Sequence, residues 1–437
     1  MLSSLSDRYY AALAAKTAGK AASAVEIVDS VLESARESGA SDVHLVPVES
    51  GLDVLWRIDG VLHYAYQVPP NVLGAIISRL KTLGRMEIAE KRRPLDGRLK
   101  TRTPENKEIE LRLSTVPTAM GEKMVMRIFD PEVLQRSFYE LGFSDRELGI
   151  WDRQTKHTNG IILVTGPTGS GKTTTLYSTL KNLANSEVNV CTIEDPIEMV
   201  EPSFNQIQVH NAIDLSFATG VKSLLRQDPD IIMIGEIRDL ATAEMAVQAA
   251  LTGHLVLSTL HTNDSPSAVT RMLELGVPAY LINATVLGVM AQRLVRTLCP
   301  HCKEPTVLDE SVWRDFSQGL QIDTSTPNKP VGCIECRQTG YLGRVGLYEM
   351  MEMTKPLKTL VKPESDLEDL RSQAKKDGLL TLRHSGAQKV AQGITTMEDV
   401  LTDLRRITDV TTLPVLFEST GLTLNLFEIF HAYFELA

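Results

Sequence analysis

The sequence predicts an α/β protein whose larger part is built on a parallel sheet and follows a smaller α+β domain. Two observations predict the sheet. Four continuous apolar runs are separated by amphipathic stretches of helix length, at residues 161–164, 190–193, 231–234 and 255–258. Continuous runs indicate strands buried on both faces, with helices on each side of the sheet. The second observation is a glycine-rich turn directly after the first run, where a strand would pass into a helix.

The first 130 residues show a different pattern. Apolar residues at helical spacing predict helices over 25–38 and 71–89. Short strands are predicted at residues 42–47, 54–58, 109–115 and 124–129. The predicted division of the chain is a lead-in at 1–24, a small α+β domain at 25–130, a linker at 131–150, a P-loop domain at 151–408 and a tail of unknown role at 409–437.

Composition excludes several classes of protein. The 437 residues carry a net charge of −10, which disfavours a general nucleic-acid binder. The one basic run, 91–93, is typical of a solvated face. No segment has the roughly 18 apolar residues that a membrane-spanning helix needs, and residues 1–20 lack the apolar run of a signal peptide. We therefore expect a cytosolic protein without a transmembrane segment.

The glycine-rich turn fits the phosphate-binding pattern G-x-x-x-x-G-K-[ST]. Its expected nucleotide-binding residues are Gly166, Pro167, Thr168, Gly169, Ser170, Gly171, Lys172, Thr173 and Thr174. Lys172 should reach the β- and γ-phosphates of ATP, and the Thr173 hydroxyl should bind Mg²⁺. The alternative is a chance glycine-rich turn, but the strand before it and the helix after it favour a phosphate loop.

Acidic residues follow two of the predicted strands. Glu194 ends the second strand, at the edge of the sheet where parallel α/β proteins bind ligands. An exposed acidic turn is the alternative there. After the third strand, Gly235 stands where many P-loop enzymes have an aspartate, and Glu236 follows it. Glu236 is our candidate for orienting the attacking water, and the missing aspartate makes Glu194 more plausible as a carboxylate near the metal.

Two histidines flank the fourth predicted strand. A histidine at a strand end usually has a structural hydrogen bond. Because His261 follows the strand at its carboxyl end, it is the better candidate for sensing the γ-phosphate. His254 precedes the strand and would reach the nucleotide less directly.

Four of the five cysteines form two Cys-x-x-Cys pairs within 297–340. They are Cys299, Cys302, Cys333 and Cys336. Paired Cys-x-x-Cys motifs indicate a structural zinc site with four thiolates. Redox-active dithiols and unrelated thiols are the alternatives, although redox dithiols usually occur as one pair. Cys191 is expected to be a buried strand residue.

The chain resembles the secretion ATPase superfamily, in its type II secretion and type IV pilus extension branch. The matching segments include 41–44, 57–62, 94–98, 114–117, 291–296 and 343–349, together with the phosphate loop and the acidic and histidine segments. The resemblance covers residues 25–408. It implies a RecA-like core, a PAS-like small domain and a hexamer at the cytoplasmic face of the inner membrane. ATP hydrolysis would drive pilin or pseudopilin polymerisation through an inner-membrane platform protein, with a further subunit for membrane docking.

The resemblance also implies arginine fingers from the small domain, Arg112 and Arg127, with Arg98 as a third candidate. Each of the first two has apolar neighbours in its strand and should project from the opposite face. Their alternative is a solvent-facing strand arginine. These ATPases often carry a further N-terminal docking domain, and we expect none before Val25. Two other functions stay open: a nucleotide-binding regulatory scaffold with little turnover, and a DNA-uptake or conjugation motor.

Overall fold

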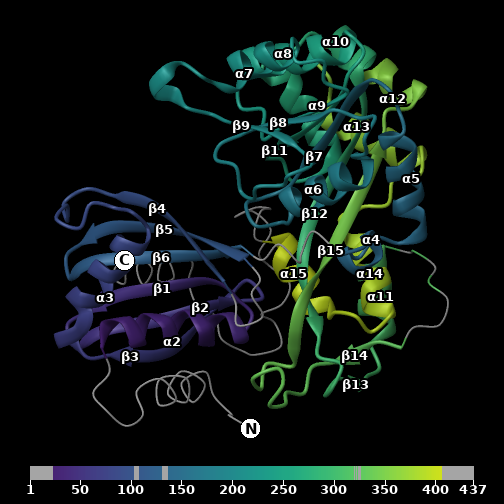
Figure 1. Ribbon diagram of the computed structural model, residues 1–437. Coiled ribbons are helices and arrows are strands. Elements are labelled where there is room, and N and C mark those ends of the chain that lie inside the picture. The colour runs from purple at the N-terminus through teal and green to yellow at the C-terminus, as the bar shows by residue number, and fades with distance from the viewer. Residues whose placement is uncertain are drawn as a thin grey trace, which may run out of the picture.

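The computed structural model describes residues 23–102, 108–129, 136–318, 320, 322 and 326–405. It has two parts that lie side by side, a small domain in purple and blue and a core domain in teal to yellow (Figure 1). The predicted tail at 409–437 and most of the predicted lead-in lie outside the described residues. Within the described residues no helix is long and apolar enough to cross a membrane.

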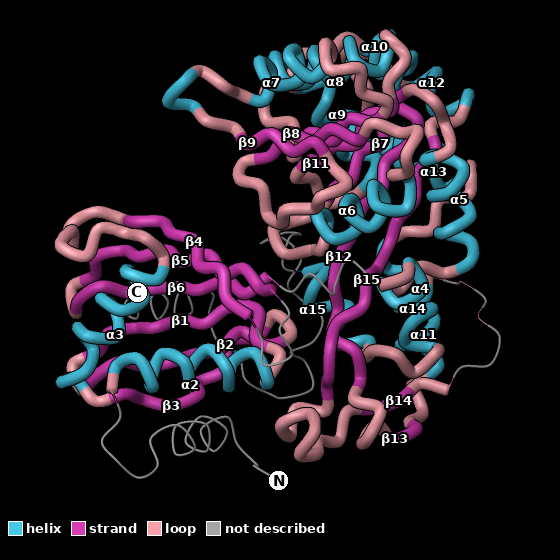
Figure 2. The backbone as a smooth tube through the Cα atoms, in the orientation of Figure 1, coloured by secondary structure: helices cyan, strands magenta, loops and turns pink. Residues whose placement is uncertain are grey.

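The small domain is an antiparallel sheet with two helices against one face (Figure 2). In the described residues its strand order is β3-β2-β1-β6-β5-β4. The strands are β1 (Ala40–Val48), β2 (Gly51–Ile58), β3 (Val61–Val68), β4 (Leu95–Arg102), β5 (Glu108–Thr118) and β6 (Gly121–Phe129), and the helices are α2 (Ala24–Glu37) and α3 (Pro70–Leu83). A capping box between Ser23 and Glu26 starts α2.

Two details of the small domain differ from the sequence prediction. Strands β3 and β4 were not predicted, because β3 exposes Val61, Leu62 and Tyr64 and β4 is mostly polar, so neither has a clear apolar face. The helix predicted to reach residue 89 ends at Leu83, since Gly84 caps it and Arg85 takes a left-handed conformation at φ 56°.

The core domain has the predicted parallel sheet. Strands β7 (Gly160–Thr165), β8 (Val190–Glu194), β10 (Ile231–Ile234) and β11 (Leu255–Leu260) are parallel and fully buried. Among the described residues the order is β15-β12-β7-β11-β10-β8-β9. The other strands flank these four: β9 (Asn205–Gln208) lies on one side, and β12 (Val286–Leu298) and β15 (Tyr341–Glu352) lie on the other. The last two form a long antiparallel pair that extends beyond the rest of the sheet (Figure 1).

Helices cover both faces of this sheet, as the continuous apolar runs predicted. Along β7, Ile161 and Leu163 pack into one cluster with α8 and α9, while Ile162 and Val164 pack into another with α5 and α6. The helices are α4 (Phe138–Leu141), α5 (Asp145–Thr155), α6 (Lys172–Leu183), α7 (Phe217–Leu224), α8 (Leu240–Leu251), α9 (Ser265–Glu274), α10 (Ala279–Thr285), α12 (Lys355–Leu360) and α13 (Leu367–Lys376).

A smaller subdomain surrounds the far end of the β12–β15 pair. Its elements are β13 (Glu304–Pro305), β14 (Asn328–Lys329), α11 (Glu310–Ser317), α14 (Leu382–Ala391) and α15 (Met397–Arg405). Helix α15 packs on β12, facing the small domain (Figure 1). The cysteine pairs lie at the ends of the same two long strands, next to Leu298 and Tyr341.

Candidate active site

The glycine-rich turn connects β7 to α6, as the sequence predicted. Gly171 begins the helix with φ 87°, a left-handed conformation that glycine adopts without strain. The side chain of Lys172 is buried and folds back over the loop, where its Nζ donates to the carbonyl oxygens of Gly166 at 2.7 Å and Pro167 at 3.0 Å. Burial lowers the pKa of Lys172 to about 8, against the opposing charge of Glu236.

The phosphate loop faces a cleft of about 1430 Å³ between the two domains. Residues 167–175 line one wall. The facing wall belongs to the small domain and includes Asp42, Arg57 and Arg127. Thr173 and Thr174 lie in the first wall, at the N-terminus of α6, where backbone amides favour an anion. Groups from two separate domains therefore face each other across one cleft, which is large enough to admit a nucleotide.

Glu236 and His261 lie together on the core wall. The strands β10 and β11 are neighbours, so their carboxyl ends bring the two side chains within 3.3 Å, from His261 Nε2 to Glu236 Oε2. Arg238 pairs with the other carboxylate oxygen of Glu236, and that pairing raises the pKa of Arg238. His254 lies at the opposite end of β11, where its Nδ1 is 2.9 Å from the Ala249 carbonyl oxygen.

Glu194 also lines the cleft, but the residue is only 4% exposed, and neighbouring side chains hold its carboxylate by hydrogen bonds. Tyr177 on α6 donates to Oε2 at 2.7 Å, and Thr192 donates to Oε1 at 2.6 Å. Gln206 on β9 adds a third donor at 3.2 Å. Glu194 is therefore not the exposed acidic turn that the sequence left open, and its oxygens are fixed in the wall below the phosphate loop.

The candidate arginines lie in one row across the small-domain sheet. Cross-strand pairing joins Arg98 to Arg112, Arg112 to Arg127, and Arg127 to Asp42, so all these side chains share one face. That face is opposite the buried Leu111.

The members of this arginine row have different partners. Arg127 pairs with Asp42 at 3.0 Å, and its side chain is 57% exposed. Arg98 Nη2 donates to Gln208 of the core domain at 2.7 Å. Arg112 stacks over the Phe129 ring at 4.8 Å, and its Nε and Nη2 have no hydrogen-bond partner among the described residues. Burial lowers the pKa of Arg112, which Glu198 partly opposes.

Sequence reasoning missed several charged groups of the cleft, and three of them lie on the core wall. Glu198 lies four residues after Glu194, and its charge acts on both Lys172 and Arg112. Arg238 and Arg293 also line the cleft. Two signals were available. Arg238 follows Glu236 by two residues, and Arg293 lies on β12 just past the point where its pairing with β7 ends, so both residues lie at the carboxyl edge of the parallel strands.

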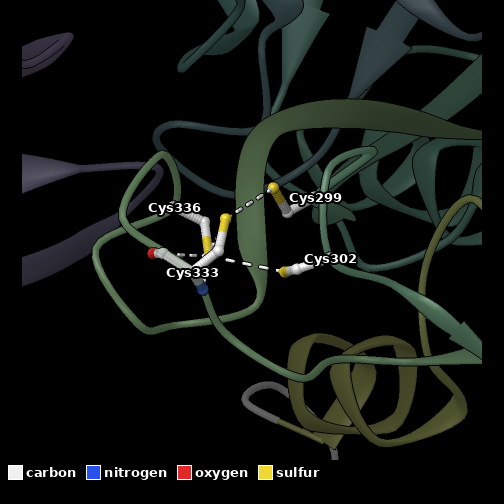
Figure 3. Close-up of side chains that lie close together, drawn as sticks. All are labelled: Cys299, Cys302, Cys333 and Cys336. Atoms are coloured by element: carbon white, nitrogen blue, oxygen red, sulfur yellow. Dashed lines mark hydrogen bonds between the residues drawn. The ribbon is translucent and has the colours of Figure 1, made fainter.

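The four cysteines predicted to bind zinc converge at the base of the β12–β15 pair, with their sulfur atoms pointing toward one another (Figure 3). The four Sγ atoms lie within 4.8 Å, with Cys299–Cys333 at 3.8 Å and Cys302–Cys336 at 3.7 Å. Tetrahedral zinc with bonds of about 2.3 Å requires sulfur–sulfur distances of about 3.8 Å. Backbone amides of Cys333 and Gly340 donate to Cys336 Sγ, which favours a thiolate. The cluster thus fits a zinc ion.

Comparison with known proteins agrees with this site. Residues 17–402 match the family of type II/IV secretion system proteins. The chain is 60% identical over 380 residues to the type IV pilus assembly ATPase TfpB of Acinetobacter baylyi, covering 86% of this chain and 65% of that protein. It is 43% identical over 380 residues to the type II secretion system protein E of Pseudomonas aeruginosa, covering 86% and 74%.

Solved structures give the same fold. The pilus retraction motor PilT with bound ADP has a TM-score of 0.58 at 25% identity, covering 86% of this chain and 96% of that one. The Legionella pneumophila ATPase DotB has a TM-score of 0.63 at 22% identity, covering 86% of this chain and 95% of that one.

The fold and the phosphate loop define the class of protein, a P-loop protein with a RecA-like core. Within that class, the chain belongs to the type II/IV secretion system protein family, which confirms the resemblance seen in the sequence. The chain spans 65% of the length of the pilus assembly relative.

Proposed function

We propose that this chain is a mechanical ATPase that drives type IV pilus assembly or type II secretion. One observation carries the proposal: the phosphate loop and the Glu236–His261 pair form one wall of a cleft, and a second domain forms the other. A site with walls in two domains can open and close as they move. Hydrolysis would thereby change the angle between the domains and act on an inner-membrane platform protein to polymerise pilin or pseudopilin.

The residues of the core wall have proposed roles in hydrolysis. Lys172 binds the β- and γ-phosphates, and Thr173 supplies a hydroxyl ligand for Mg²⁺, with its neighbours 166–174 around the phosphates. Mg²⁺, when bound, neutralises charge on the β- and γ-oxygens. Glu236 orients the attacking water, and His261, 3.3 Å from it, senses the γ-phosphate. Glu194 serves as the carboxylate near the metal, with its oxygens already oriented by hydrogen bonds.

The arginine row provides the remaining charge. Arg112 and Arg127 act as arginine fingers, which stabilise the charge that spreads over the γ-phosphate in the transition state. The exposed position of Arg127 and the unpartnered nitrogens of Arg112 support these roles. Each arginine can reach a γ-phosphate only if the small domain is held at a suitable position. We propose that a homohexameric ring, the working form of the protein, holds it there.

The ring would lie in the cytoplasm, against the inner membrane, bound there through a docking subunit and the platform protein. The chain itself has a net charge of −10, and no nucleic-acid partner is proposed. The four cysteines would hold one zinc ion that clips the ends of β12 and β15 together. Between the two machines, the 60% identity to a pilus assembly ATPase, against 43% to a secretion protein, favours the pilus.

The test is Mg²⁺-ATPase activity as a function of protein concentration, for the full chain and for Lys172→Ala. Activity per chain should rise with concentration as rings form, and Lys172→Ala should abolish it. ATP binding without turnover at any concentration, alone or with membrane partners, would instead favour the regulatory scaffold. Stimulation by DNA would favour a DNA-directed motor.

A further inference from the structure

A buried arginine lies directly beneath the phosphate loop. Strand β12 runs parallel to β7 and pairs up to Ala291 and Thr165, so the next two residues continue under the loop. The carbonyl oxygen of Gln292 and Nη1 of Arg293 both lie against Gly166, at 2.5 and 3.1 Å from where its Cβ would be. The Arg293 side chain is 3% exposed.

The hydrogen bonds of Arg293 leave its charge incompletely compensated. Nη2 donates to the Asn263 carbonyl oxygen at 3.0 Å, and Nη1 donates to the Gln292 carbonyl oxygen at 3.1 Å. Nε is buried and has no hydrogen-bond partner among the described residues. The carboxylate of Asp403 on α15 lies 3.9 Å from Nε, which is too far for a hydrogen bond. Burial lowers the pKa of Arg293, and the carboxylates of Asp403, Glu349 and Asp264 oppose that shift. None of these carboxylates accepts a hydrogen bond from Arg293 among the described residues, so the buried guanidinium can still gain from an anion that comes closer.

A matched arginine in the same strand shows what a complete pairing looks like. Arg296 binds Asp399, one turn before Asp403 on α15, through Nε at 2.7 Å and through its own backbone amide at 2.6 Å. It also stacks on the Tyr341 ring at 4.0 Å. Arg296 therefore anchors α15 to β12, whereas the contact between Arg293 and the same helix is loose.

The location of Arg293 indicates which anion it would take. It lines the cleft together with Lys172, and its positive charge acts on that lysine. Asn263, its partner, follows His261 by two residues. On its other side Arg293 borders a second cavity of about 500 Å³ with Asp264 and Glu349, whose oxygens already accept hydrogen bonds from Ser265, Ser267, Arg371 and Leu382. The nucleotide phosphates are the anion that can come closest.

We propose that Arg293 is a ligand of the terminal phosphate of ATP bound to its own subunit, and that it leaves Asp403 when it binds that phosphate. This inference rests on the proposed function as an ATPase. Arg293 would then distinguish ATP from ADP, and the position of α15 would depend on which nucleotide is bound. The arginine row of the small domain is a separate source of charge, because Arg293 belongs to the core wall.

The experiment measures the affinity of the full chain for the non-hydrolysable analogue AMP-PNP and for ADP, both with Mg²⁺, by calorimetry. Arg293→Gln should weaken AMP-PNP binding tenfold or more and change ADP binding less than twofold, since a charge-assisted hydrogen bond to one phosphate is lost. Asp403→Asn leaves Arg293 intact and releases it from its loose partner, so it should strengthen AMP-PNP binding relative to ADP.

Arg296→Gln is the matched control. It should lower the melting temperature by loosening α15, and although Arg296 also lines the cleft, it should change the ratio of AMP-PNP to ADP affinity much less than Arg293→Gln does. The proposal would be overturned if Arg293→Gln weakened the binding of both nucleotides equally. It would also be overturned if Arg296→Gln changed the affinity ratio as much as Arg293→Gln does. If the unaltered chain bound neither nucleotide, the proposed function itself would fail, which is a distinguishable result.

Discussion

The two walls of the cleft differ in how their charged groups are held. On the core wall, Lys172 and Glu194 are buried and bonded to neighbours within the same domain. Glu236 is paired there with His261 and Arg238. On the small-domain wall, Arg127 is 57% exposed, and in the part of the chain that the structure describes it pairs across its own sheet, with Asp42. The core wall is thus fixed by its own fold.

The small-domain wall reaches the nucleotide only if the two domains keep a suitable angle. A few contacts define that angle in the described residues. Arg98 donates to Gln208 on one side of the cleft. On the other side, Asp59 accepts from the Gly343 amide at 2.9 Å and pairs with Arg337 at 3.7 Å. Few polar contacts of this kind are typical of an interface that allows relative motion.

The largest expected effect falls on the core wall. Glu236→Gln should lower kcat about a thousandfold, because a positioned base or water-orienting carboxylate contributes 10²- to 10⁴-fold. ATP binding should persist, since Lys172 and the loop are unchanged. Turnover and nucleotide affinity are measured on the same preparation, with the exposed Glu244→Gln on α8 as control. Unchanged turnover in Glu236→Gln would remove this residue from the chemistry.

The next effect falls on the small domain, where Arg127 lines the cleft and Arg112 lies beside it on the neighbouring strand. Arg112→Ala and Arg127→Ala should each lower kcat about a hundredfold, the usual cost of removing one group that stabilises transition-state charge. Lys123→Ala is a control on the same face of β6, two pleats from Arg127. The measurement is steady-state turnover at protein concentrations where activity per chain is constant. Equal small losses in all three variants would mean that this face contributes only a general positive charge.

The difference between the walls also explains what the sequence could and could not predict. The phosphate loop, the cysteine pairs and the strand-end residues Glu236 and His261 are recognisable because each motif is local or follows a buried strand. The partners of the carboxylates were not predictable. Glu194 is held by Tyr177, 17 residues earlier in the chain, and by Gln206 of an edge strand. Register across the small sheet likewise decided which arginines share a face.

The contact between Asp59 and Arg337 links the cysteine cluster to the domain angle, because Arg337 directly follows Cys336. Cys302→Ser should reduce bound zinc from about one ion per chain to a small fraction and lower the melting temperature by about 5 °C or more. Turnover should fall only severalfold, since no cluster atom lies among the lining residues of the cleft.

Zinc content by atomic absorption and thermal unfolding of the same samples test this prediction. Adding zinc back to chelator-treated, unaltered chain is the control and should restore the melting temperature. A full zinc complement in Cys302→Ser, or an unchanged melting temperature after zinc loss, would contradict a structural zinc site.

The smallest effect concerns pH and returns to the core wall. Burial lowers the pKa of Lys172 to about 8 in the nucleotide-free chain, and bound phosphates would raise it. Binding therefore takes up a proton at pH values near and above 8, so ATP affinity should be nearly complete at pH 7 and below and fall as the pH rises. The loss should be about twofold between pH 7 and pH 8 and larger by pH 9.

Lys172→Arg stays charged throughout this range and should give a flat profile, whatever its absolute affinity. Calorimetry of MgATP binding in buffers with different ionisation enthalpies measures the proton uptake directly. An affinity that does not change from pH 7 to pH 9, with no proton uptake, would mean that the lysine is already fully charged before the nucleotide arrives.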